Sequence, residues 1–135
     1  MRGFGAKIGL DVRVSPDVSV TMPWNITIGA QSAVGDRAIL YALGRIEIGE
    51  RCTVSQGAHI CAGTHDWRDR AMRLLKTTIV VGDDVWICAD AFVGPSVDVG
   101  ERAIVGARAV VTKDVEPGSI LGGNPAKVIS RRDQP

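Results

Sequence analysis

Residues 81–98 read Val81-Gly82-Asp83-Asp84-Val85-Trp86, Ile87-Cys88-Ala89-Asp90-Ala91-Phe92 and Val93-Gly94-Pro95-Ser96-Val97-Asp98, three consecutive copies of one six-residue pattern. Each hexad begins with an aliphatic residue and has a residue no larger than valine in its fifth position. Twelve hexads share these features, and their first positions are Ile28, Val34, Leu40, Ile48, Val54, Ile60, Val81, Ile87, Val93, Val99, Val105 and Val111. A weaker run at Ile8, Val14 and Val20 extends the pattern toward the N-terminus. A six-residue period fits neither a helix nor a flat sheet and predicts a solenoid of short parallel strands.

Three hexads are expected to form one triangular coil, which makes the fold class all-β, a parallel β-helix. The first-position side chains point inward and stack on their equivalents one coil away, burying a continuous aliphatic column. The fifth-position side chains lie near the corners, where only small groups fit; they are Ser32, Ala38, Gly44, Cys52, Ala58, Thr64, Val85, Ala91, Val97, Ala103, Ala109 and Val115. Gly or Asp in the second position is expected to serve the turn, because both tolerate unusual backbone angles.

The composition supports one strand-rich domain over residues 1–135. Hydrophobic residues make up 45% of the chain but aromatic residues only 4%, and Val and Ile, which favour strands, supply most of the apolar mass. The formal charge of +1 argues against a nucleic-acid-binding surface. The three cysteines form no CxxC pair, the N-terminus has no signal-peptide pattern, and no stretch could span a membrane. We therefore expect a cytoplasmic protein.

The hexad frame is interrupted once at length, between His65 and Thr78. The intervening residues, about 66–77, carry six charges and no hexad, so we expect an excursion loop that leaves the solenoid. Loops on rigid scaffolds are common locations for functional sites. After Val115-Glu116-Pro117-Gly118 the pattern fades, and a short C-terminal cap is expected over about 117–135, in which Lys127 to Arg132 cover the open end of the column.

Several segments resemble one known family. Besides the hexads, they are Gly63-Thr64-His65-Asp66, Val85-Trp86-Ile87, Val111-Thr112-Lys113-Asp114 and Gly123-Asn124-Pro125-Ala126-Lys127. Together they resemble the hexapeptide-repeat acyltransferases, with maltose and galactoside acetyltransferases as wider relatives. Three further segments look closest to the colanic-acid-type polysaccharide O-acetyltransferases: Met22-Pro23-Trp24-Asn25, Leu40-Tyr41-Ala42-Leu43-Gly44 and Ser55-Gln56-Gly57-Ala58. The resemblance covers nearly the whole chain.

The resemblance implies a left-handed parallel β-helix that acts as a homotrimer, with active sites between subunits. It implies transfer of an acetyl group from acetyl-CoA to a hydroxyl of a sugar or polysaccharide precursor, without a metal, a nucleic-acid partner or a membrane span. Members of this subgroup usually carry an apolar, aromatic-rich segment ahead of the part that matches Phe4-Gly5-Ala6-Lys7-Ile8-Gly9. Its absence here is interpreted as a shortened form or an internal start.

The chain has two histidines, His59 and His65, both in the sixth position of a hexad and both expected to face outward from the prism. His65 matches the family's catalytic histidine, whereas no direct role is expected for His59. Acyl transfer from a thioester to a hydroxyl needs a base, and imidazole suits that role near neutral pH. Its second nitrogen needs an acceptor, for which Asp66, a backbone carbonyl and an acid of another subunit are the alternatives.

The resemblance also assigns residues to the two substrates. Thr112, Lys113 and Lys127 match positions that meet CoA phosphates, with Arg131 as an addition, and Gly106, Ala107, Gly123 and Asn124 offer side-chain-free edges for the pantetheine arm. Trp86 takes an outward sixth position and is expected to contact acyl-CoA, the acceptor or another subunit. Trp24, Tyr41 and Trp67 are candidates for contacts with an acceptor sugar, although the trimer interface could equally use them.

Other chemistries are disfavoured. A covalent acyl-enzyme would need a nucleophilic cysteine, but Cys52, Cys61 and Cys88 take small-residue positions, so direct transfer is favoured, with backbone N–H groups stabilising the oxyanion. A zinc site of the γ-class carbonic anhydrase type needs three histidines, and the chain has two. The competing acceptors are an amino sugar, an antibiotic and serine. A catalytically silent structural β-helix is the non-enzymatic alternative.

Overall fold

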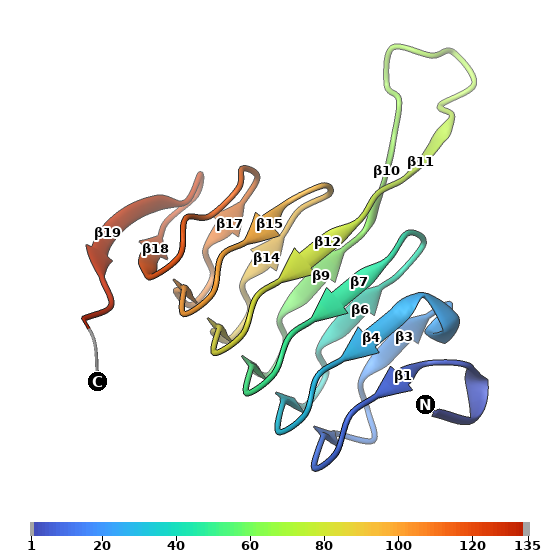
Figure 1. Cartoon of the computed structure of the whole chain (residues 1–135). Helices are drawn as coiled ribbons and strands as arrows, with labels where there is room; N and C mark the ends of the chain where they lie inside the picture. Colours follow the sequence, from blue (N-terminus) through green and yellow to red (C-terminus); the bar gives the residue numbers. More distant parts are fainter. Residues whose placement is uncertain (1, 134–135) are drawn as a thin grey trace.

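The computed structural model describes residues 2–133, which form a parallel β-helix of stacked triangular coils (Figure 1). The chain visits three faces in turn, named A, B and C here. Face A holds β1 (Lys7–Ile8), β4 (Ile26–Ile28), β7 (Ile46–Ile48), β12 (Ile79–Val81) and β15 (Asp98–Val99). Face C holds β3 (Ser19–Thr21), β6 (Ile39–Tyr41), β9 (His59–Cys61), β14 (Phe92–Val93) and β17 (Val110–Val111).

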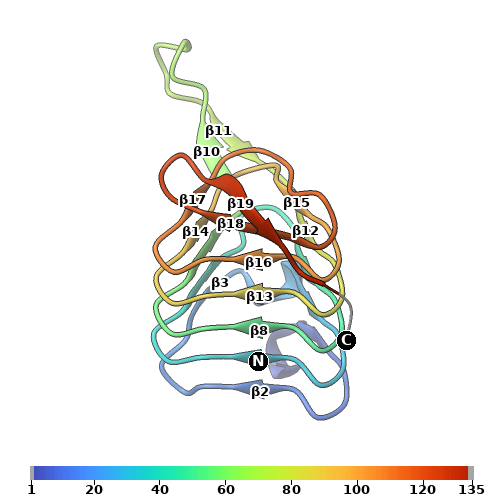
Figure 2. The same ribbon diagram turned by 90° about the vertical axis from the view of Figure 1, so that its left-hand side faces the viewer.

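Face B is turned toward the viewer in Figure 2. It holds β2 (Arg13–Val14), β5 (Ala33–Val34), β8 (Thr53–Val54), β13 (Trp86–Ile87), β16 (Ile104–Val105), β18 (Ser119–Gly122) and β19 (Lys127–Arg131). Its strands pair in parallel except for β19, which runs antiparallel to β18. The strand-rich, helix-poor architecture that the six-residue period predicts is confirmed.

The aliphatic column is also confirmed. All twelve first-position side chains are at most 2% exposed. Register pairs such as Ile28 with Ile48 and Val54 with Ile87 stack them one coil above another. Ten of the twelve fifth-position residues are buried, and the two exceptions are Gly44, which packs against Thr77, and Thr64, which directly precedes the interruption of the frame. Stacking of aliphatic groups between coils is therefore the main source of stability.

The turns correct one expectation. From face A to B and from face B to C the chain uses four-residue turns, and in most of them the third residue is left-handed, with φ of 71° at Gly57 and of 55–62° at Asp11, Gln31, Arg37, Arg51, Asp84, Asp90, Arg102 and Arg108. The second-position glycines are not the residues with positive φ. They are small because the coils approach closely: a Cβ on Gly29 would lie 2.6 Å from the carbonyl carbon of Gly49, and one on Gly82 would lie 2.7 Å from the amide nitrogen of Glu101.

The turns from face C to face A line one edge of the prism, called corner CA here. They comprise residues 22–25, which include the 3-10 helix η2 (Pro23–Asn25), then residues 42–45, 62–78, 94–97 and 112–114. Unlike the other turns, these differ in length. Corner CA is therefore the edge where the fold accepts inserted residues.

The interruption of the hexads is an antiparallel hairpin rather than an irregular loop. Its strands are β10 (Gly63–His65) and β11 (Leu74–Lys76), and it extends away from the coils at corner CA (Figures 1 and 2). The excursion therefore begins at Gly63, earlier than the predicted start at residue 66, and only residues 66–73 form its tip. The hexad that starts at Ile60 stops after Ala62, because the next residues pair with β11.

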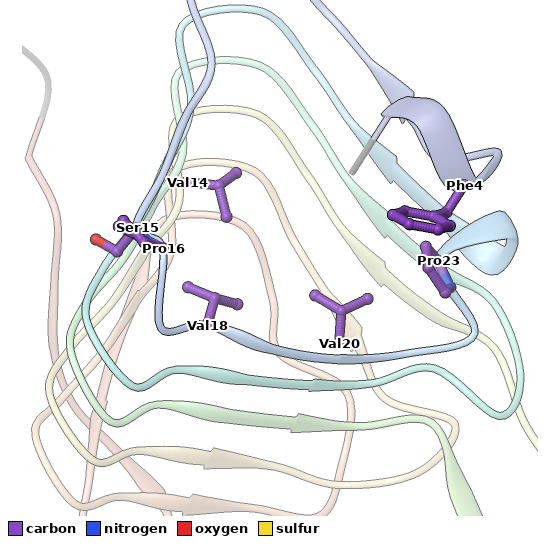
Figure 3. A pocket seen from close by; sticks show the side chains of 7 residues that line it. All are labelled: Phe4, Val14, Ser15, Pro16, Val18, Val20 and Pro23. Carbon is purple, nitrogen blue, oxygen red and sulfur yellow. The ribbon is translucent and has the colours of Figure 1, made fainter.

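The two ends of the solenoid differ. At the C-terminal end β18 still stacks on β16 as a regular strand, and β19, which coincides with the segment expected to cap the column, pairs antiparallel with β18. Gln134 and Pro135 lie outside the described residues. At the N-terminal end, after the 3-10 helix η1 (Arg2–Phe4), the column is open. There a cavity of about 500 Å³ is lined by Phe4, Val14, Ser15, Pro16, Val18, Val20 and Pro23 (Figure 3).

Candidate active site

His65 lies on the outgoing strand of the hairpin and is exposed. It stands outside the prism, which corrects the expectation that it faces outward from a prism face. Its Nδ1 is 2.7 Å from the carbonyl oxygen of Met72. A carbonyl oxygen only accepts hydrogen bonds, so Nδ1 carries a proton, and in the neutral ring Nε2 then keeps its lone pair. This tautomer presents Nε2 as a base.

The hairpin tip is built to hold the Met72 carbonyl in position. Met72 has a left-handed φ of 51°, and its N–H donates to the carbonyl of Asp69 at 2.8 Å. The Asp69 N–H donates in turn to the carbonyl of Asp66 at 3.0 Å. These two turns bring the chain back so that the carbonyl of Met72 faces the imidazole of His65.

Asp66 supports the tip and does not bond the imidazole. Its Oδ1 accepts the N–H of Arg68 at 3.1 Å, and its Oδ2 lies 3.4 Å from the guanidinium of Arg73. The Asp66 N–H also donates to the carbonyl of Arg73 at 2.8 Å. Of the three acceptors considered for Nδ1, the structure therefore favours a backbone carbonyl over Asp66.

His59 has a different environment. It lies half-buried on face C, with its ring edge-to-face against Phe92 (centroids 5.3 Å apart) and Tyr41 (6.4 Å). Burial lowers the pKa of His59. Its Nε2 is buried without a hydrogen-bond partner among residues 2–133. His59 thus packs between Phe92 and Tyr41 and is more buried than its expected outward position implies.

A cavity of about 360 Å³ opens at the C-terminal part of corner CA. Thr112, Lys113 and Lys127 all line it, together with Val111, Asp114, Leu121, Pro125, Ala126 and Val128. Three residues predicted to bind CoA phosphates are therefore brought together. The two ammonium groups at one small cavity provide a local attraction for phosphate.

The hairpin and the cavity lie along the same edge. The hairpin leaves the coil between β9 and β12, the turn 94–97 follows between β14 and β15, and the turn 112–114 comes after β17. The N–H of Ser96 donates to Oγ1 of Thr77 at 3.3 Å, which ties the root of the hairpin to the next turn. His65 and the cavity therefore share corner CA, with one turn between them.

Other predicted ligand residues lie away from this cavity. Trp86 is on face B, 47% exposed, and its Nε1 donates to Oγ of Ser55 at 2.9 Å. Arg131 pairs with Glu116, with 3.2 Å between its guanidinium and the carboxylate. Neither residue lines the same cavity as Lys113 and Lys127.

The small residues proposed for the pantetheine arm lie at the turn from face B to C and next to it. The Gly106 N–H donates to the carbonyl of Leu121 at 2.8 Å, and a Cβ there would lie 2.6 Å from that oxygen. The Gly123 carbonyl accepts the N–H of Val110 at 3.0 Å. Ala107 and Asn124 are exposed. Close packing between coils is thus one reason for the glycine at position 106.

The aromatic candidates are spread along the molecule. Trp24 lies in η2, in the first turn of corner CA, and is 63% exposed. Trp67 is at the hairpin tip, 72% exposed, with the Arg68 guanidinium 4.7 Å from its ring centroid. Tyr41 is half-buried on face C beside His59. Two of the three therefore lie along the edge that carries His65.

Sequence reasoning did not identify Met72. Its contribution is a backbone carbonyl, which leaves no signature in the residue type. Within residues 2–133 no three metal-ligating side chains gather in one place, and no helix has the length and hydropathy to cross a bilayer.

The chain is similar to several known proteins in sequence and in fold. The family model described as bacterial transferase hexapeptide (six repeats) matches residues 78–113. The putative colanic acid biosynthesis acetyltransferase WcaF of Escherichia coli strain K12 is 42% identical over 132 residues, covering 98% of this chain and 72% of that protein. A hexapeptide-repeat acetyltransferase of Vibrio cholerae, solved with acetyl coenzyme A, superposes with a TM-score of 0.93 at 26% identity, covering 98% of this chain and 74% of that one. A maltose O-acetyltransferase of Clostridium difficile 630 gives 0.90 at 25% identity, covering 98% and 73%.

Proposed function

Because the chain belongs to the hexapeptide-repeat acetyltransferases, left-handed β-helix enzymes that use acetyl-CoA, we propose that it acetylates a sugar hydroxyl with His65 as the general base. The observation that carries this proposal is the 2.7 Å contact between Nδ1 of His65 and the Met72 carbonyl. That contact holds the imidazole in the tautomer whose Nε2 can take a proton. The exposed position of His65 leaves Nε2 open to an acceptor.

The proposed reaction is a direct transfer. Nε2 of His65 removes the acceptor's hydroxyl proton as its oxygen attacks the thioester carbonyl, so a C–O bond forms. Collapse of the tetrahedral oxyanion, stabilised by backbone N–H groups, breaks the C–S bond. The imidazolium then returns its proton to the departing thiolate, which leaves as CoA. Protons and charge balance without any other reactant.

The state of the cysteines supports direct transfer over a covalent acyl-enzyme. Cys52 is 1% exposed, and burial raises the pKa of its thiol. Burial also raises the pKa of half-buried Cys88. The Cys61 thiol donates to the carbonyl of Gly63 at 3.2 Å. The thiolate, the nucleophilic form of cysteine, is therefore disfavoured at Cys52 and Cys88.

The cavity at corner CA fits the phosphate groups of acetyl-CoA. Lys113 and Lys127 supply cations and Thr112 a hydroxyl, and all three line one cavity of about 360 Å³. We propose that these residues hold the nucleotide end of acetyl-CoA, with the backbone edges at Gly123 and Asn124 beside the pantetheine arm. Trp86 and Arg131 are left out of this assignment, because both lie away from the cavity.

The acceptor is proposed to be a sugar or polysaccharide precursor, as the names of the WcaF relative and the maltose O-acetyltransferase suggest. The exposed rings of Trp24 and Trp67 are suited to stacking on sugars. We further propose that the enzyme is a cytoplasmic homotrimer with active sites between subunits. The hairpin extends from its own coils with Met72 and Leu74 48% and 40% exposed, and a neighbouring subunit would cover them.

Release of CoA in the presence of acetyl-CoA and candidate acceptors tests the proposal. The panel contains maltose, a methyl galactoside, an amino sugar, chloramphenicol and serine, which separates hydroxyl sugars from the competing acceptors. His65→Ala should lower kcat by about 10²- to 10⁴-fold, the usual contribution of a general base, while acetyl-CoA still raises the melting temperature. Full activity of His65→Ala would refute the assignment, and sedimentation velocity checks the trimer.

A further inference from the structure

One face of the hairpin carries more than the histidine. In the β10–β11 register His65 lies opposite Leu74, and Gly63 lies opposite Lys76. Side chains two residues apart on a strand point to the same side, so His65, Leu74 and Lys76 share one face. The position diagonal to His65, next to Gly63, is therefore occupied by a lysine.

The ammonium group of Lys76 has no partner among the described residues. Lys76 is exposed, and its side chain forms no hydrogen bond or ion pair with any of residues 2–133. Gly63 opposite it has no side chain that could cover the ammonium group. A cation without an ion-pair partner among residues 2–133 thus shares one face of the hairpin with the proposed base.

Positive charge is concentrated on this hairpin. Residues 63–76 contain four basic side chains, Arg68, Arg70, Arg73 and Lys76, and two acidic ones, whereas the rest of the chain carries twelve basic and thirteen acidic residues. Both carboxylates are used inside the tip: Asp66 pairs with Arg73, and Asp69 Oδ1 accepts the N–H of Ala71 at 3.0 Å. The cations of Arg70 and Lys76 are left facing solvent.

A second cation belongs to the same edge. Arg45 ends the preceding turn of corner CA, is exposed, and accepts the N–H of Ile79 at its carbonyl, 2.9 Å away. Its side chain also forms no ion pair among the described residues. The root of the hairpin is therefore flanked by cations from two turns.

We propose that the acetyl acceptor is an anionic sugar, with a carboxylate or phosphate that binds Lys76 while its hydroxyl faces His65. The proposal rests on the function proposed above and names its substrate class. The donor does not account for Lys76, because Lys113 and Lys127 already supply cations at the separate cavity. An anionic group on the acceptor pairs with the one cation that shares a face with the base, and that pairing orients the hydroxyl.

Three glucose derivatives test the charge: methyl glucoside (neutral), methyl glucuronide (carboxylate) and glucose 1-phosphate (phosphate). The readouts are the ratio of kcat/KM for each anionic acceptor to that of the neutral one, and the Kd of each sugar for the CoA-bound enzyme. We expect ratios of about tenfold or more for the wild type, as one charge-assisted hydrogen bond provides. Lys76→Gln should bring these kcat/KM ratios close to one, whereas Lys76→Arg, which keeps the positive charge, should retain part of the preference. Lys7→Gln, an exposed lysine on β1, is the matched control and should keep them.

The outcomes distinguish the proposed acetyltransferase function from the proposed anionic acceptor. A preference for only the glucuronide or only the phosphate supports an anionic acceptor and identifies its group, and a preference for both supports selection by charge. Equal Kd values for the three sugars in the wild type, or a preference that Lys76→Gln retains, would overturn the proposal. If no sugar is acetylated but the anionic ones still bind more tightly through Lys76, the proposed function fails and the anion site stands. Added salt should reduce the preference, because exposed charges are screened.

Discussion

A single methyl group at Gly44 is expected to disable catalysis while leaving the solenoid folded. Gly44 lies in the turn of corner CA that precedes the hairpin, and its N–H donates to the carbonyl of Ala62 at 2.9 Å. A Cβ at this position would lie 2.6 Å from both the amide nitrogen and the carbonyl carbon of Thr77, and closer still to its carbonyl oxygen. Thr77 directly follows β11, so this backbone is the root of the hairpin.

The size of the displacement follows from these distances. Non-bonded carbon atoms prefer separations of about 3.5 Å, so the Thr77 backbone must retreat by at least about 1 Å to admit the methyl group. The hairpin moves with its root, and His65 moves with the hairpin relative to the cavity at Lys113. A misplacement of about 1 Å can cost about 100-fold in rate. We therefore expect Gly44→Ala to lower kcat by about 100-fold and to cost about 1–3 kcal/mol of stability as an overpacking mutation.

The control is Gly82→Ala, which makes a milder backbone clash at another corner. A Cβ on Gly82 would lie 2.7 Å from the amide nitrogen of Glu101, at the turn from face A to face B and therefore away from corner CA. Both variants should unfold at lower urea concentration with unchanged strand content by circular dichroism. Only Gly44→Ala should lose kcat in the CoA-release assay. Wild-type kcat in Gly44→Ala, or an equal loss in Gly82→Ala, would refute the coupling between hairpin root and catalysis.

Three further outcomes are expected. Ile60→Ala empties a fully buried position and should lower the free energy of unfolding by about 2–5 kcal/mol in urea titrations; a smaller loss would contradict the continuous column. Replacing Lys113 and Lys127 together by Gln should raise the KM for acetyl-CoA by about tenfold or more, and an unchanged KM would exclude the cavity as the phosphate site. Burial lowers the pKa of His59 below its ordinary 6.5, so the unfolded chain takes up the proton first and the native state loses stability as pH falls below that value. His59→Phe should therefore reduce the loss of melting temperature between neutral pH and about pH 5, and an equally steep loss would show that other groups cause it.

The sequence predicted the solenoid well because one geometric requirement recurs in every coil. An aliphatic residue is needed every six positions wherever a strand contributes to the column. The twelve first-position residues between Ile28 and Val111 meet this requirement, with exposures of at most 2%. The same logic misassigned the glycines. Gly29 and Gly82 were attributed to backbone freedom, whereas the approach of the next coil explains them. Distances between coils are set by the tertiary structure, and they leave no signal in the local sequence.

The hairpin was located only approximately for a related reason. Gly63, Thr64 and His65 have the extended backbone of a solenoid strand, and the hexad frame runs through them without a break. Their partner is β11, nine or more residues later, and nothing in the pattern distinguishes pairing with β11 from pairing with the next coil. The loop was therefore predicted to start at residue 66, and His65 was assigned to a prism face.

The residues of the candidate site were predicted only in part. A prediction agrees with the structure where the residue lies at corner CA, and it fails where the residue lies on another face of the coil. Thr112 and Lys113 lie in a turn of corner CA, and Lys127 comes back to the same end of the prism, so they meet at one cavity. Trp86 is in a strand of face B, and Arg131 extends along β19 toward Glu116, so neither lines that cavity. Successive hexads lie on different faces, and a list of candidate residues does not reveal which face each one occupies until the coils are built.

Corner CA is a suitable place for an active site because it is the edge where the fold tolerates inserted residues. At the turns from face A to face B, second-position glycines such as Gly29 and Gly82 approach the backbone of the next coil too closely for a Cβ. At corner CA an insertion of residues 62–78 leaves the coils in register, since Ile46 still pairs with Ile79 and Ile60 with Val93. The coils thus hold the cavity at Lys113 fixed while the hairpin varies independently. Acceptor preference can therefore change through the hairpin without altering the part of the site proposed to hold acetyl-CoA.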